Sequence, residues 1–186
     1  MSSLTPKEPS KIIERKASLN AKKIRFEINK FQLPNGIDGE FGIIRHPGAS
    51  LAVPITNDGE VIILRQYRFA VERRILEFPA GTLEDGEDPL SAIKRELQEE
   101  SGYKSSKWDE LGQMIPAPGY ADEIIHLFLA RDLEKLKEKP KGDIDEDIEV
   151  IKMSPEELNT CICDQSEALD GKTIAAWFRA CKLLNL

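Results

Sequence analysis

The residues best suited to do chemistry lie on a single segment, 88–101, with helical spacing. Three aliphatic residues of this segment share one face at about 100° per residue, namely Leu90, Ile93 and Leu97. Glu100 falls within about 20° of Ile93 on that helix, and Glu96 lies about 40° beyond Glu100. The acidic side chains of an ordinary solvated helix would point away from the apolar face. Here Glu96 and Glu100 border it.

This arrangement of carboxylates is electrostatically unfavourable without a partner. Two carboxylates ~5 Å apart repel by about 3 kcal/mol at an effective dielectric near 20, and Glu99 adds a third charge. Shared protons, solvation or a bound cation relieve such repulsion. Hard oxygen ligands suit Mg²⁺ or Mn²⁺ better than zinc. From the charge pattern alone, a solvated acidic face and a cation site both remain open.

Composition excludes some partners. The 186 residues carry a formal charge of −7, which argues against nucleic acid as the main partner but not against a small phosphorylated ligand. No stretch approaches the ~20 apolar residues of a membrane span. Cys161, Cys163 and Cys181 lack zinc-site spacing, so we expect reduced thiols and a cytoplasmic protein.

The elements that must position these residues follow from periodicity and turn signals. We expect a loose, polar start over residues 1–20. Strands are predicted at 23–28, 40–45, 50–56, 61–67, 75–78, 111–115, 124–130 and 148–153. Helices are predicted from Asp88-Pro89 to Gly102, from Ser154-Pro155 onward, and over 172–184. This pattern indicates a mixed α/β domain.

The residues around the acidic segment match a known signature. From Gly81 the chain reads Gly81-x5-Glu87-x7-Arg95-Glu96-Leu97-x-Glu99-Glu100-x-Gly102-Tyr103. This resembles the Nudix box of the Nudix hydrolase superfamily, with Tyr103 at a position where the family has an aliphatic residue. A chance match in a chain of this length is on the order of one in a million.

The resemblance implies a site that holds divalent ions. In this family a loop–helix–loop presents glutamates to a diphosphate across two or more Mg²⁺ or Mn²⁺ ions. Glu96 and Glu100 would be metal ligands, Glu99 a further ligand or catalytic base, and the backbone carbonyl of Ala80 another ligand.

The other signature positions are expected to support this site. Arg95 would hold a glutamate in place, and Glu87 would brace the loop. Gly81 would let the chain pass closely, and Gly102 would end the helix.

Further stretches resemble the ADP-ribose pyrophosphatase subfamily. Arg65-Gln66-Tyr67-Arg68 precedes Leu76-Glu77-Phe78-Pro79-Ala80-Gly81, and a loop reads Ala117-Pro118-Gly119-Tyr120-Ala121-Asp122-Glu123. The resemblance implies that Arg68, Pro118, Gly119 and Glu123 bind substrate, with Arg68 at the phosphates. On their own, a proline–glycine pair is a turn signal and an arginine of this kind forms an exposed ion pair.

An acidic stretch, 143–150, resembles the family loop that carries the catalytic base, which would be Glu146. Ile144 stands where some relatives have a second acid, and a plain acidic surface loop remains an alternative. Residues 170–176 resemble the last helix of the subfamily. Gly171-Lys172-Thr173 is not a phosphate loop, because Ser166 occupies the position of its first glycine.

The resemblance also implies an architecture and an assembly. We expect the Nudix fold, of class α/β (α+β), with a mixed β-sheet sandwiched between helices. Residues 1–46 would form an N-terminal extension with an antiparallel β segment, and residues 47–186 the Nudix domain. The extension is expected to build a homodimer in which Arg45 reaches the partner's site.

The predicted function is Mg²⁺-dependent hydrolysis of a nucleoside-diphosphate sugar, most of all ADP-ribose, to AMP and ribose 5-phosphate. GDP-mannose, ADP-glucose or another nucleotide sugar is the alternative substrate. A catalytically silent nucleotide-binding module is the alternative class, and the presence of Glu96, Glu99 and Glu100 argues against it. We expect no nucleic-acid partner and no membrane partner.

Overall fold

The computed structural model describes residues 7–8, 10–141, 147–164 and 166–186. The strands are β1 (Lys11–Ala21), β2 (Ile24–Gln32), β3 (Asp38–Arg45), β4 (Ala49–Pro54), β5 (Val61–Arg68), β6 (Arg73–Glu77), β7 (Ala80–Thr82), β8 (Tyr103–Met114), β9 (Ile125–Lys135) and β10 (Ile148–Met153). The helices are α1 (Pro89–Glu96), a π-helical turn η1 (Leu97–Ser101), α2 (Pro155–Asp164) and α3 (Gly171–Leu184).

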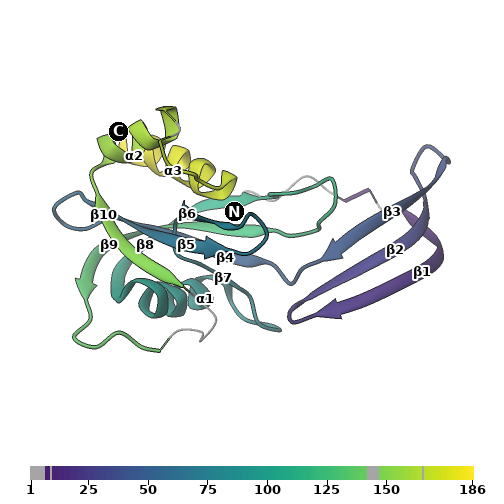
Figure 1. The fold of residues 1–186 in the computed structure, drawn as a ribbon, viewed down its shortest axis with the longest axis horizontal. Coiled ribbons are helices and arrows are strands. Elements are labelled where there is room, and N and C mark those ends of the chain that lie inside the picture. Colours follow the sequence, from purple (N-terminus) through teal and green to yellow (C-terminus); the bar gives the residue numbers. More distant parts are fainter. Residues whose placement is uncertain (1–6, 9, 142–146, 165) are drawn as a thin grey trace.

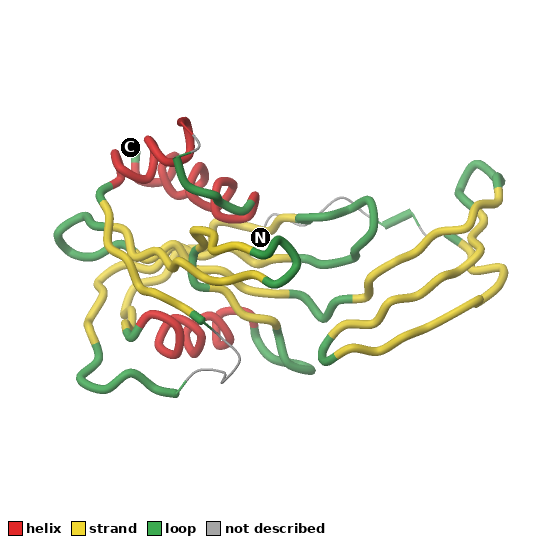
Figure 2. Tube along the Cα trace, in the orientation of Figure 1, coloured by secondary structure: helices red, strands yellow, loops and turns green. Residues whose placement is uncertain are grey.

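The body of the protein is a layered α/β structure. One sheet has the order β7-β4-β9-β8 with β4 and β9 parallel, and a second has the order β10-β5-β6 with antiparallel pairs. Helix α1 lies on one side of these sheets, while α2 and α3 lie on the other (Figures 1 and 2). The predicted mixed sheet between helices is therefore confirmed.

Strand β4 joins the two layers of the core. All six of its residues are buried, as expected for a central strand covered on both faces. Leu51 and Val53 pack into the cluster beneath α3 that includes Trp177, whereas Ala52 packs with Ile93 beneath α1. Because successive side chains of a strand point to opposite faces, this one strand fixes the distance between α1 and α3.

The N-terminal strands form a separate sheet, β1-β2-β3, that projects from the body (Figures 1 and 2). The predicted antiparallel β segment is confirmed, but the expected loose start over residues 1–20 is wrong for the part that forms β1. Ten of the eleven side chains of β1 are exposed. Backbone pairing with β2 along most of its length, and not burial, makes this segment a strand.

The two faces of this N-terminal sheet are unusual in polarity. Glu27 and Asn29 are buried, while Ile24 and Phe26 on the opposite face are more than a third exposed. Glu27 is ion-paired with Arg25 and Arg45. The hydrogen bond from Arg45 lowers the pKa of Glu27, against the effect of its burial. The alternation that predicts β2 thus places Ile24 and Phe26 toward solvent.

Helix α3 is tied to the sheet by a buried hydrogen bond that tests this packing. The Phe78 N–H donates to Thr173 Oγ1 at 3.1 Å, and Thr173 is fully buried. Thr173→Val keeps the shape and leaves the N–H without its acceptor, so we expect a loss of about 1–3 kcal/mol in the free energy of unfolding. Urea unfolding measures it. The exposed Thr160→Val should change stability by less than about 0.5 kcal/mol, and equal effects would contradict the account.

Candidate functional site

The acidic segment folds as predicted up to Glu96 and then changes its geometry. Asp88 caps α1 by accepting a hydrogen bond from the Ser91 N–H, and Gly102 ends the segment with a φ of 75°. Between them, residues 97–101 form a π-helical turn, a local widening that is frequent at functional sites. Glu100 lies in this turn and is only 3% exposed.

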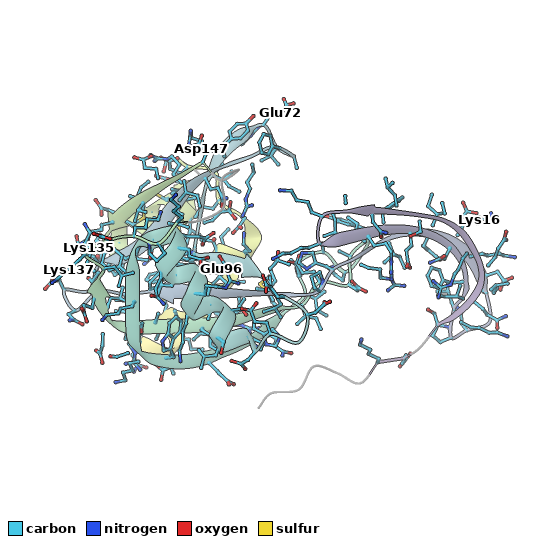
Figure 3. All side chains as sticks on the ribbon, turned by 90° about the horizontal axis from the view of Figure 1, so that it is seen from below. Lys16, Glu72, Glu96, Lys135, Lys137 and Asp147 are labelled. Carbon is cyan, nitrogen blue, oxygen red and sulfur yellow. The ribbon has the colours of Figure 1, made fainter. Side chains whose placement is uncertain are left out.

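Two carboxyl groups of this segment are held against strand β7. The Glu100 carboxylate accepts a hydrogen bond from the Ala80 N–H at 2.9 Å. The Glu96 carboxyl group occupies the space beside Gly81, where a Cβ atom would lie 2.1 Å from its Cδ and Oε1 atoms. A side chain at position 81 would therefore displace the Glu96 carboxyl group from this place. Figure 3 shows Glu96 on α1, at the side of the body that faces the N-terminal sheet.

Arg95 brings a positive charge to three glutamates around this segment, Glu87, Glu96 and Glu99. Its Nη1 donates to Glu96 at 2.8 Å and to Glu99 at 3.1 Å, and its Nη2 lies 3.4 Å from Glu87. Burial lowers the pKa of Arg95, but the carboxylates outweigh burial and raise that pKa above its ordinary value. Burial raises the pKa of Glu96 despite Arg95.

The glutamates open onto a large cavity of about 1280 Å³. Six of the predicted site residues line it, namely Arg68, Ala80, Gly81, Glu96, Glu100 and Glu123. The other predicted substrate residues, Arg45, Pro118 and Gly119, do not line it, and neither does Glu99. A second cavity, of about 310 Å³, lies between β1 and β2 beside Glu27 and does not include the acidic residues of α1.

The chemistry of this site fits a hard divalent cation. Within the described part of the chain, no three His, Cys, Asp or Glu side chains converge as they stand on a single metal position. Mg²⁺ does not require such a cage, since it is commonly bound by one or two carboxylates, waters and substrate phosphates. Glu96 and Glu100 supply two carboxylates on one cavity wall, beside the Ala80 backbone. The residues present therefore fit the ion.

The loop at 117–123 is attached to the N-terminal sheet. The Ile44 N–H donates to the Tyr120 carbonyl at 2.7 Å, and the Asp122 carboxylate accepts from Arg45 Nη1 at 3.0 Å. Arg45 also donates to Glu27. Arg45 is therefore bonded within its own chain. Glu123, the residue after Asp122, lines the cavity.

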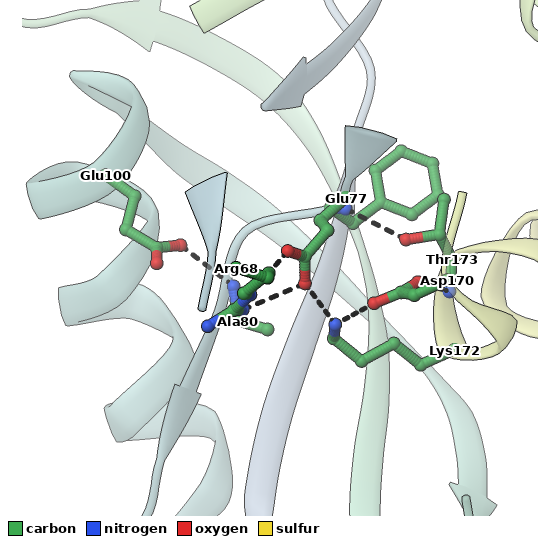
Figure 4. Close-up of polar contacts among 8 residues, drawn as sticks. Arg68, Glu77, Ala80, Glu100, Asp170, Lys172 and Thr173 are labelled. Atoms are coloured by element: carbon green, nitrogen blue, oxygen red, sulfur yellow. Dashed lines mark hydrogen bonds and ion pairs between the residues drawn. The ribbon is translucent and has the colours of Figure 1, made fainter. Parts of the chain in front are cut away.

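Sequence reasoning missed the partners of Arg68. Arg68 Nε and Nη2 donate to the two carboxylate oxygens of Glu77 at 2.6 and 2.9 Å, and Lys172 contacts the same carboxylate and that of Asp170 (Figure 4). Burial and the Arg68 pair oppose each other at Glu77, and its pKa is lowered in sum. Burial lowers the pKa of Lys172. An available signal was a glutamate within the otherwise apolar run Ile75–Phe78.

The predicted base, Glu146, lies outside the described residues. The adjoining described residue, Asp147, forms an ion pair with Arg74, and its carbonyl accepts a hydrogen bond from the Tyr67 N–H at 3.2 Å. Strand β10 then pairs with β5 from Ile148 onward. The acidic stretch therefore leads into the strand beside the one that ends at Arg68.

Comparison with known proteins decides the family. The model of the NUDIX domain matches residues 45–178. The chain belongs to the Nudix family. The sequence-based resemblance to the family is thereby confirmed, and the matched range includes α1 and η1.

Individual relatives agree with this assignment. The Nudix chain is 38% identical to the ADP-ribose pyrophosphatase of Bacillus subtilis (strain 168) over 166 residues, a stretch that covers 89% of each protein. It is 36% identical, with the same coverage, to the methanol dehydrogenase activator of Bacillus methanolicus. A crystal structure of an ADP compounds hydrolase superposes with a TM-score of 0.80 at 22% identity, over 98% of this chain and 97% of that one. This last likeness confirms the fold.

One more finding concerns the helices. None of those in the described residues is long and apolar enough to cross a membrane.

The close approach at Gly81 gives a direct test. Gly81→Ala would push the Glu96 carboxyl group off the wall of the cavity, so Mn²⁺ affinity should fall by about 10–100-fold with the fold intact. Calorimetric titration with Mn²⁺ measures the affinity, and circular dichroism monitors the fold. Gly119→Ala is the matched control, because nothing lies within 4 Å of its added Cβ. Unchanged Mn²⁺ binding in Gly81→Ala would refute the role given to Glu96.

Proposed function

We propose that this Nudix chain hydrolyses the diphosphate of nucleoside-diphosphate sugars, with ADP-ribose as the leading substrate and AMP and ribose 5-phosphate as products. The observation that carries the proposal is one cavity of about 1280 Å³ lined by two box glutamates and by Arg68. This space suits a ligand of nucleotide-sugar size. The ADP-ribose pyrophosphatase relative supports the choice of substrate.

The proposed cofactor is Mg²⁺ or Mn²⁺, as two or more ions. Glu96, Glu100 and the Ala80 carbonyl would hold them, with Glu99 as a further ligand or base. Bound ions of this kind lower the pKa of the attacking water and neutralise charge on the leaving phosphate. Arg95 would keep Glu96 and Glu99 in place from their flank, because its guanidinium already contacts both.

The remaining steps fall to side chains of the chain. In the reaction a water oxygen forms a bond to one phosphorus, the bridging P–O bond breaks, and the second phosphate leaves with the bridging oxygen. Arg68 would bind non-bridging oxygens through guanidinium N–H groups other than those that Nε and Nη2 donate to Glu77. Glu146 would take the proton of the water. Glu123, which lines the cavity, would contact the substrate, and so would Pro118 and Gly119 of the same loop, which are not among the lining residues.

We further propose a homodimer built by the N-terminal segment, residues 1–46, on the Nudix domain, residues 47–186. The exposed face of β1 and β2 carries Leu19, Ile24 and Phe26, which are 69%, 37% and 43% exposed. Covering such side chains is favourable. To act toward the partner's site, Arg45 would exchange its bonds to Glu27 and Asp122 of its own chain. A cytoplasmic location remains the prediction made from the cysteines.

A panel of substrates tests the proposed function. ADP-ribose, ADP-glucose and GDP-mannose are incubated with the chain, with and without Mg²⁺, and the products are separated by chromatography. We expect Mg²⁺-dependent release of AMP from ADP-ribose at the highest kcat/KM. Preference for GDP-mannose would move the assignment to the alternative substrate.

The relative named methanol dehydrogenase activator motivates a second candidate, a module that activates a dehydrogenase. Activation of an alcohol dehydrogenase by this chain, with no hydrolysis of any member of the panel, would favour it. Hydrolysis of ADP-ribose by the purified chain would exclude the catalytically silent form of this candidate.

Glu100 provides the sharpest single substitution. Glu100→Gln keeps an oxygen that accepts the Ala80 N–H and removes only the charge, so the fold should persist while nearly all turnover is lost. Initial rates on ADP-ribose with Mg²⁺ measure this. The exposed Glu138→Gln serves as the control and should retain the wild-type rate. Near-normal turnover in Glu100→Gln would refute the metal role.

The proposed assembly has its own test. Small-angle scattering at micromolar concentration should give the mass of a dimer for the wild type. Phe26→Glu should shift the protein toward monomer, because it places a charge in the proposed interface. Phe178→Glu, at an exposed side chain of α3, should leave the mass unchanged. A monomeric wild type would disprove the dimer.

A further inference from the structure

Lys172 occupies a position that its own helix disfavours. It lies in the first turn of α3, directly after the N-cap residue Asp170 and Gly171. A cation near a helix N-terminus is repelled by the helix dipole. The side chain is also only 18% exposed, and burying an ammonium group is costly unless carboxylates compensate. Helix stability alone does not explain a lysine here.

The carboxylates around Lys172 connect it to the cavity. Its ammonium group contacts the carboxylates of Asp170 and Glu77 (Figure 4). Glu77 is 1% exposed, and both of its carboxylate oxygens accept hydrogen bonds from Arg68. One of these oxygens, Oε2, is shared between Arg68 and Lys172. A chain of charges thus runs from α3 through β6 to the end of β5.

Arg68 is the half-exposed member at the end of this series of ion pairs. Its side chain is 42% exposed and lines the cavity together with Lys172. Its bidentate pair with Glu77 fixes the guanidinium only as well as the Glu77 carboxylate itself is fixed. Lys172 holds the buried carboxylate from the side opposite to Arg68, so that Glu77 presents both oxygens to the guanidinium in one orientation (Figure 4).

We propose that Lys172 is a positioning residue for substrate binding: through Glu77 it fixes the Arg68 guanidinium in the orientation that meets the substrate's diphosphate. This inference rests on the proposed function for the role of Arg68. It assigns Lys172 to the positioning of Arg68 and not to direct contact with substrate, because two carboxylates already surround the ammonium group.

The first test separates positioning from stability. Lys172→Met should raise the KM for ADP-ribose about tenfold and leave kcat within about threefold, since an aligned ground-state contact is lost and the metal ligands are untouched. Lys172→Arg should recover much of the affinity. Lys182→Met, on the exposed part of the same helix, should match the wild type. A Lys172→Met protein with wild-type KM would overturn the inference.

A double-mutant cycle tests whether Lys172 acts through Arg68. Arg68→Met and the Arg68→Met/Lys172→Met pair should share the same raised KM, because the second change removes the support of a group already absent. Additive effects of the two changes would overturn the inference and indicate direct contact. Should Lys172→Met fail to fold, Glu77→Gln takes its place in the cycle with the same expectation.

Calorimetric binding of ADP to the same proteins separates this inference from the proposed function. ADP supplies the diphosphate without turnover. The inference would be supported if Lys172→Met weakens ADP binding in the wild-type background but has no effect on ADP binding in the Arg68→Met background. If the wild type also fails to hydrolyse ADP-ribose, the proposed function would be refuted while the inference stands. Hydrolysis by the wild type with ADP affinity unchanged in Lys172→Met would do the reverse.

Discussion

The close packing of α1 and η1 against strand β7 is the constraint on which the site depends. The Glu96 carboxyl group fills the space that a Cβ of residue 81 would need, and the Glu100 carboxylate accepts the Ala80 N–H. Both acidic groups are therefore largely removed from water, and a negative charge is costly in such a buried place. Both border a cavity, and Arg95 on the same helix pairs with Glu96. A divalent cation offsets that cost and uses the same oxygens.

The two walls of the cavity differ in the charged groups that they present. The wall formed by β7, α1 and η1 presents carboxylates, while the wall formed by the end of β5 and the start of α3 presents Arg68 and Lys172. Partly buried ion pairs lie on both walls, around Arg95 on one and around Glu77 on the other. Strand β4, packed beneath α1 on one face and beneath α3 on the other, holds the two walls at a fixed separation.

Local features of this architecture could be predicted from the sequence. The capping residue Asp88, the left-handed Gly102 and the box glutamates act through neighbours a few residues away, and their pattern predicts the helix and its acidic edge. The π-helical turn could not be predicted, because the spacing of apolar residues does not distinguish it from a continued α-helix. Strand β1 was missed because its polar composition reflects exposure, whereas its pairing with β2 is backbone chemistry.

Ion-pair partners that are far apart in the sequence could not be predicted, for a different reason. Glu77 and Lys172 are 95 residues apart, and Arg45 and Asp122 are 77 apart. No local period relates such positions, and only the sheet order brings them together. The apolar alternation of Ile24 and Phe26 predicted a strand correctly, but it could not tell whether the chain's own body covers that face.

The most direct measurement of the central claim is the position of a bound cation. Crystals grown with Mn²⁺ and a non-hydrolysable ADP-ribose analogue would be examined by anomalous diffraction at the manganese edge. We expect an anomalous peak at about 2.0–2.2 Å from carboxylate oxygens of Glu96 and Glu100, between them and the diphosphate. A well-ordered diphosphate in the cavity with no anomalous peak beside either glutamate would contradict it.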